Sequence, residues 1–163
     1  MGQAYSGVCT NCGFKITKNI GVGFMFPTVY GEVRKRAWDG EYGEEMMYFL
    51  RKNPQRAIDA EIDLYVCEEC GDISSDYNLG MYIPREEDEE MLKEADFSSD
   101  DTGNSNYFMH DELRRKFKKF KDYDHRCEMC HGRLKIVVGK GYDKLKCPRC
   151  KNKLIPGDII MWD

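Results

Sequence analysis

Eight cysteines arranged as four Cys-x-x-Cys pairs limit the possible folds of this chain more than any other feature. Two intervening residues let the backbone turn in a tight knuckle that directs both sulfurs at one ion, and two knuckles supply the four thiolates that tetrahedral zinc accepts. We therefore predict two zinc ions per chain, held by all eight cysteines: Cys9, Cys12, Cys67, Cys70, Cys127, Cys130, Cys147 and Cys150.

The residues that follow each pair suit a tight turn. Gly13 and Gly71 directly follow the first two pairs and can adopt the positive φ that such a turn commonly needs. The third pair is followed by His131-Gly132 and the fourth by Lys151-Asn152, where asparagine also tolerates a left-handed conformation. All four pairs are therefore plausible metal-binding knuckles.

The spacing of the last two pairs favours a shared site. Cys130 and Cys147 enclose residues 131–146, a length typical of one zinc site. Within and after this gap the sequence predicts strands at 134–138, 142–146 and 154–162. This C-terminal part resembles a zinc ribbon, and the resemblance implies a scaffold rather than a particular function. We expect Cys127, Cys130, Cys147 and Cys150 to bind one zinc ion.

The first two pairs are then left for the other site. The gap between them is too long for a simple ribbon loop, and its apolar periodicity predicts helices over about residues 28–38 and 42–52. Alternating apolar residues flank both knuckles, and Val8-Cys-x-x-Cys-Gly13 is weakly repeated as Val66-Cys-x-x-Cys-Gly71. Residues 1–84 therefore resemble a rubredoxin-like zinc module with a two-helix insertion.

These elements predict a small, metal-stabilised α+β protein with two zinc modules. Charge separates the modules, because residues 85–106 carry a formal charge of −7 and residues 107–163 carry +7. The acidic segment has few apolar residues to bury and is typical of a solvated linker. We expect a module at 1–84, a linker at 85–106, and a basic helix followed by a zinc ribbon at 107–163.

The basic helix is expected over residues 110–121, with an apolar stripe that begins at Met109. Its cationic side chains suit a solvated helix face, a nucleic-acid-binding face, or a face for an acidic partner such as the linker. The candidate nucleic-acid-binding residues are Arg114, Arg115, Lys116, Lys118, Lys119 and Lys121. Further basic residues follow in the ribbon, among them Lys135, Lys140, Lys144, Lys146, Lys151 and Lys153.

A second resemblance concerns about 25 residues around the fourth pair. The segment Lys144-Leu-Lys-Cys147-Pro-Arg-Cys150-Lys151 is similar to the second knuckle of phage Com-like zinc-ribbon regulators. As a family, these regulators imply RNA binding. Nucleic-acid binding through the C-terminal ribbon is therefore one alternative function.

Other metal chemistry fits the cysteines less well. Tetrahedral sulfur ligation does not distinguish zinc from iron, so a rubredoxin-like iron electron carrier is a further alternative. Cys127-Glu-Met-Cys130-His131 matches the attachment motif for c-type haem, but the sequence shows no export signal and a knuckle explains the motif better. His110-Asp-Glu112 resembles part of the zinc deaminase signature, but no proline precedes Cys127, and a deaminase site would need a histidine ligand and an open position for water. A site closed by four thiolates has no vacant position to activate water, so we expect no enzyme activity.

The remaining expectations concern location and partners. No apolar run is long enough to cross a bilayer, and the N-terminus lacks the basic and apolar regions of a secretory signal. We expect a cytoplasmic protein whose thiols stay reduced, with no membrane partner and no small-molecule substrate. The leading hypothesis is a non-catalytic zinc-binding adaptor module whose partner is a protein or a nucleic acid.

Overall fold

The computed structural model describes residues 2–53, 55–88, 90, 107–158 and 160–162. The predicted fold class is confirmed, because the described residues form a small α+β structure with three antiparallel sheets. The chain divides into two compact units. The first unit comprises Met1–Phe24, Ile62–Tyr77 and Asp124–Asp163, and the second comprises Met25–Glu61 and Asn78–Tyr123.

This division differs from the modules expected at residues 1–84 and 107–163, since each of those ranges contributes to both units. The physical reason is that the strands pair with partners far away in sequence instead of only with their neighbours along the chain. Most of the expected acidic linker at 85–106 lies outside the described residues.

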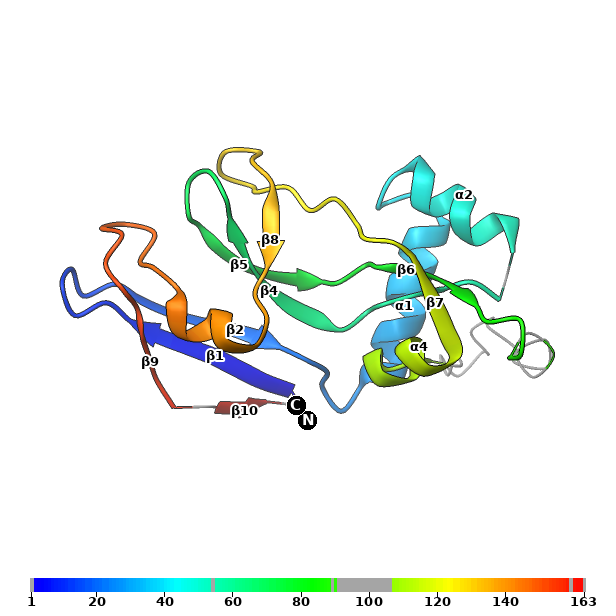
Figure 1. The fold of residues 1–163 in the computed structure, drawn as a ribbon, viewed down its shortest axis with the longest axis horizontal. Helices are drawn as coiled ribbons and strands as arrows, with labels where there is room; N and C mark the ends of the chain where they lie inside the picture. Colours follow the sequence, from blue (N-terminus) through cyan, green and yellow to red (C-terminus); the bar gives the residue numbers. More distant parts are fainter. Residues whose placement is uncertain (1, 54, 89, 91–106, 159, 163) are drawn as a thin grey trace. The chain divides into compact units, whose positions relative to one another are not determined.

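One sheet of the first unit brings together strands from both ends of the chain. β1 (Gly2–Val8) pairs with β2 (Lys15–Ile20), β9 (Ile155–Pro156) and β10 (Ile160–Trp162). All these pairings are antiparallel, and Val8 lies opposite Ile155. Figure 1 shows β9, in red, beside β1, in blue.

The other sheet of the first unit has the order β5-β4-β8. β4 (Ile62–Cys67) forms a hairpin with β5 (Ile73–Tyr77), and β8 (Leu134–Ile136) pairs with the other edge of β4. The 3-10 helix η1 (Gly139–Lys144) follows β8. The strand expected at 142–146 is therefore wrong, because η1 occupies most of this range and β8 pairs with β4 instead.

The core of the first unit joins both sheets to the cysteines. Leu64 and Leu154 have no exposed surface, and Cys9 and Cys147 are equally buried among them. The cluster is completed by Tyr5, Ile73, Val137 and Leu145. Sulfur atoms are thus part of the apolar core, so any change at the cysteines disturbs its packing.

The second unit combines helices with the third sheet. α1 (Phe26–Trp38) and α2 (Glu44–Lys52) confirm the two predicted helices to within two residues at each end. Pro27 lies in the first turn of α1, where proline is favoured. The sheet has the order β3-β6-β7, formed by β3 (Ala57–Ile58), β6 (Met81–Pro84) and β7 (Phe117–Lys121).

The predicted basic helix is shorter than expected. α4 (His110–Lys116) ends where Phe117 adopts an extended backbone, and residues 117–121 continue as β7, which pairs antiparallel with β6. Leu113 and Phe117 are buried, whereas Phe120 is exposed and its ring stacks on that of Phe49. Pairing with β6 supplies ladder hydrogen bonds and therefore overrides the helical periodicity read from the sequence.

A buried carboxylate holds the start of α4. Asp59 has no exposed surface, and the Nδ1 of His110 lies 2.5 Å from its Oδ2. The backbone N–H of Glu61 donates to Asp59 Oδ1 at 3.1 Å, and the backbone N–H of His110 donates to Glu61 Oε1 at 2.7 Å. The hydrogen bond with Asp59 raises the pKa of His110 above its usual value, although partial burial opposes the shift.

The His110–Asp59 pair predicts a pH-dependent stability of the second unit. Below the usual pKa of histidine the pair contributes fully, and the contribution is lost as the pH rises through the raised pKa of the folded state. We expect His110→Gln to cost about 1–2 kcal/mol near pH 5.5, because His110 is only partly exposed, and less near pH 8.5. Urea unfolding of both proteins across this range measures the difference. A difference independent of pH would contradict the prediction.

Candidate metal centre

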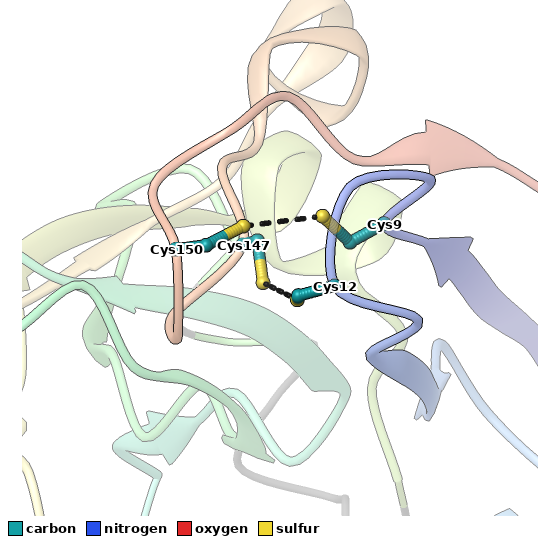
Figure 2. A group of neighbouring side chains, drawn as sticks. All are labelled: Cys9, Cys12, Cys147 and Cys150. Atoms are coloured by element: carbon teal, nitrogen blue, oxygen red, sulfur yellow. Dashed lines mark hydrogen bonds between the residues drawn. The ribbon is translucent and has the colours of Figure 1, made fainter.

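The eight cysteines gather in two groups, both in the first unit. One group contains Cys9, Cys12, Cys147 and Cys150, and the other contains Cys67, Cys70, Cys127 and Cys130. The predicted sequential pairing of knuckles is therefore wrong: the first knuckle meets the fourth, and the second meets the third. Figure 2 shows the four sulfurs of the first group directed toward one another from two facing turns.

The sulfur positions fit tetrahedral metal coordination. In the first group Cys9 and Cys150 are 3.3 Å apart at their sulfurs, and Cys12 and Cys147 are 3.5 Å apart. The corresponding distances in the second group are 3.4 Å for Cys67 and Cys130 and 3.7 Å for Cys70 and Cys127. Zinc–sulfur bonds of about 2.3 Å place tetrahedral sulfurs about 3.8 Å apart. The spacing is close to that value, and all eight cysteines are free rather than disulfide-bonded.

All four knuckles share one hydrogen-bonding pattern. The N–H of the first cysteine donates to the carbonyl five residues later, and the N–H of the residue after the second cysteine donates back to the first cysteine's carbonyl. In the first knuckle these bonds join Cys9 to Phe14 and Gly13 to Cys9, at 2.8 and 2.9 Å. The other three knuckles repeat them at 2.7 to 3.1 Å. The repeated turn directs both sulfurs of each pair to the same side.

The residue directly after each second cysteine has a positive φ, whatever its type. Gly13 and Gly71 confirm the prediction, with φ of 71° and 76°. His131 and Lys151 occupy the same place with φ of 59° and 63°, so the left-handed residue of the fourth knuckle is Lys151 and not the expected Asn152. This non-glycine strain costs about 1–2 kcal/mol per residue, and the knuckle hydrogen bonds offset it.

The strands around the two groups are organised alike. In the first group the knuckle between β1 and β2 is joined by β9, which follows the fourth knuckle and pairs with β1. In the second group the knuckle between β4 and β5 is joined by β8, which follows the third knuckle and pairs with β4. The weak sequence repeat around Val8 and Val66 thus marks two equivalent hairpins. The result is two ribbon-like modules, one nested inside the other along the chain.

Loop length alone would have favoured the sequential pairing. Cys12 and Cys147 are 135 positions apart, whereas Cys130 and Cys147 enclose only residues 131–146. Loop-closure entropy grows slowly, so an approximately eightfold longer loop costs only about 2 kcal/mol. The strand pairings of β8 and β9 and the apolar core outweigh this cost.

Hydrogen bonds to sulfur favour some thiolates, and crowding disfavours others. The backbone N–H of Cys70 lowers the pKa of Cys67 to about 6, and the side-chain amide of Asn152 lowers the pKa of Cys150 to about 5. For Cys12 the N–H of Phe14 acts in the same direction, but burial and the neighbouring sulfurs raise its pKa to about 12. Four thiolates therefore need a cation to ionise together, and metal binding releases their remaining protons.

Gly132 lies against the second group. A Cβ at this position would lie 3.1 Å from the sulfurs of both Cys67 and Cys130 and 2.8 Å from the carboxyl carbon of Glu69. The sequence indicates only a turn at Gly132, whereas its close approach to the sulfurs is a consequence of the tertiary pairing.

The two cysteine groups are also connected by a hydrogen bond, because the Lys151 ammonium donates to the carbonyl of Cys70.

The predicted nucleic-acid-binding residues lie on α4 and β7 in the second unit, whereas all eight cysteines belong to the first. Three of the six are in ion pairs: Lys116 with Glu112, Lys119 with Asp122, and Lys121 with Glu45, at 3.4, 2.5 and 2.5 Å. No ion pair with a described residue involves the other three, which are Arg114, Arg115 and Lys118.

No protein-family model, curated protein or solved structure matches this chain. Among the described residues, no helix has the length and apolar character needed to span a membrane. The sulfur geometry supports two four-cysteine metal sites of the ribbon or knuckle type.

The nested pairing predicts which cysteine substitutions act on the same site. We expect Cys12→Ser/Cys150→Ser to lose one metal ion and Cys12→Ser/Cys70→Ser to lose both, because only the first double variant is confined to one group. Native mass spectrometry of the metal-loaded chain counts the ions, with each single variant as a control that keeps one. If the knuckles were paired sequentially, Cys12 and Cys70 would belong to one site, and Cys12→Ser/Cys70→Ser would keep one ion.

Gly132 provides a second prediction for the inner group. Gly132→Ala should weaken metal binding there, because the added methyl group pushes against two of the four sulfurs. Overpacking of this kind costs about 1–3 kcal/mol, which corresponds to at least about a fivefold loss of affinity. Chelator competition monitored by metal release should show one ion leaving more easily while the other is unchanged. Equal release of both ions would contradict this assignment.

Proposed function

We propose that each group holds one structural zinc ion and that the protein is a non-catalytic binding module. The observation that carries the proposal is that four cysteines complete each group, so every position of a tetrahedral site is a thiolate. Such a site leaves no position at which the metal could activate water. The zinc ions are therefore assigned to stability and the surface around them to recognition.

Zinc has a clear structural task in this topology. The first unit is assembled from three segments separated by long stretches of the second unit. Its described core is small, consisting of a cluster of eight buried residues. A structural zinc site contributes about 10–16 kcal/mol to a small fold, which exceeds what so small a core supplies. The two ions would hold the outer and the inner pairs of knuckles together.

Iron is the competing occupant, because four thiolates in a tetrahedron bind it in the same geometry. Zinc is preferred here since closed four-cysteine sites of paired knuckles are the common form of structural zinc. The two metals also imply different functions, because iron would make the protein an electron carrier. Metal identity therefore distinguishes the binding module from the redox alternative.

Metal analysis of the purified full chain tests the proposal. We expect two zinc ions per chain, no iron, and no absorbance band in the visible range. Removal of zinc by a strong chelator should abolish amide exchange protection in β1, β4, β8 and β9, because these strands are joined through the knuckles. The second unit, which contains no cysteine, should keep more of its protection.

Two results would overturn the assignment. Stoichiometric iron with reversible one-electron reduction would favour the electron carrier. Full retention of exchange protection in β1, β4, β8 and β9 after complete zinc removal would show that the metal is not structural.

A further inference from the structure

A cavity of about 450 Å³ opens in the first unit beside the second and fourth knuckles. It extends from Gly71, which ends the second knuckle, to Cys147 and Lys151 in the fourth. The segment from β8 to η1 supplies most of the remaining wall. Its size is in the range of ordinary small-ligand sites, and it accommodates one nucleotide-sized molecule.

The floor of the cavity is aliphatic. Val137 and Leu145 are buried members of the unit's core, whereas Ile136 and Val138 remain 37% and 66% exposed. Val66 from β4 completes this floor. Exposed branched side chains beside a concave apolar surface favour a ligand with an apolar or flat face that covers them.

Four lysines surround this floor: Lys135, Lys144, Lys146 and Lys151. Among the described residues that line the cavity, none is acidic. Four cations around a low-dielectric floor concentrate positive potential and attract an anion. The cavity therefore combines an apolar contact surface with a strongly cationic wall.

Direct contact with a metal cluster accounts for only one of the four lysines. Lys151 reaches the second knuckle through the carbonyl of Cys70. The other three, Lys135, Lys144 and Lys146, form no ion pair with any residue in the described part of the chain. They are available to a ligand, in contrast to Lys116, Lys119 and Lys121 on α4 and β7.

We propose that this lysine cavity binds a nucleoside phosphate, with the phosphate against the lysines and the base or sugar on the aliphatic floor. Lysine is a common point-charge partner for phosphate, and the floor provides the apolar contact that inorganic phosphate would not use. The nucleotide could belong to a single strand or be free, and both share this chemistry. The inference rests on the proposed binding function and names its ligand class.

The test uses the full chain loaded with zinc. Fluorescence anisotropy measures binding of labelled short oligouridylate, labelled oligothymidylate and labelled ATP at low salt, and unlabelled AMP, ATP, inorganic phosphate and polyglutamate are the competitors. We expect a labelled strand to bind with a log affinity that falls linearly with log salt, or labelled ATP to bind and AMP to displace it where the free nucleotide is the ligand. Inorganic phosphate should compete at least about tenfold more weakly than AMP, since it lacks the face that contacts the floor.

Matched variants separate the cavity from general positive charge. Lys144→Gln/Lys146→Gln should weaken binding at least about tenfold, whereas Lys35→Gln/Lys52→Gln, which removes the same charge from exposed positions on α1 and α2, should change it less than about twofold. Val138→Ser removes apolar contact without changing charge and should weaken binding about threefold. A zinc count of two in every variant shows that the sites are intact.

Several outcomes overturn the inference. The inference is wrong if neither a strand nor a nucleotide binds, or if the two lysine double variants lose affinity equally. It is also wrong if Val138→Ser leaves the affinity unchanged, or if polyglutamate competes better than any nucleotide. If these results come with two zinc ions per chain, the lysine cavity is refuted and the structural-zinc proposal stands. A zinc count below two in the unmodified chain refutes the latter independently.

Discussion

Four sulfur atoms converge on one point twice in the same unit, and the strands, the core and the order of the knuckles are all arranged around these two points. Sulfurs held 3.3 to 3.7 Å apart across facing knuckles cannot all carry charge without a cation between them. Cys9 and Cys147 are also buried core residues, so the metal ligands and the apolar side chains must pack together. Strand pairing, core packing and metal binding are therefore expected to form together.

The two sites are nested along the chain. The knuckles pair first with fourth and second with third, so the outer site cannot close until almost the whole chain is available. The segments Met25–Glu61 and Asn78–Tyr123 lie between the knuckle-bearing segments and together make the second unit. That unit thus consists of two insertions into a pair of nested ribbons. Contacts of such long sequence separation are typical of slowly folding chains.

The lysines of the two units have different surroundings. On β7, an edge strand of the third sheet, lysines and their ion pairs with Glu45 and Asp122 discourage pairing with another chain. In the first unit, lysines instead border an aliphatic cavity that contains no acidic lining residue among those described. Basic residues can therefore serve different purposes, and only their partners in space distinguish a solvated edge from a ligand site.

Features that depend on short-range interactions follow from the amino-acid order alone. The spacing within each Cys-x-x-Cys pair specifies a knuckle, and the apolar periodicity of residues 28–38 and 42–52 specifies α1 and α2. Long-range packing settled which knuckles share an ion and that β7 replaces the second half of a helix. The reason is that a knuckle is closed by its own backbone hydrogen bonds, whereas the choice of its partner depends on β8 and β9 pairing with distant strands. Those distant pairings outweigh the small entropic advantage of the shorter loop.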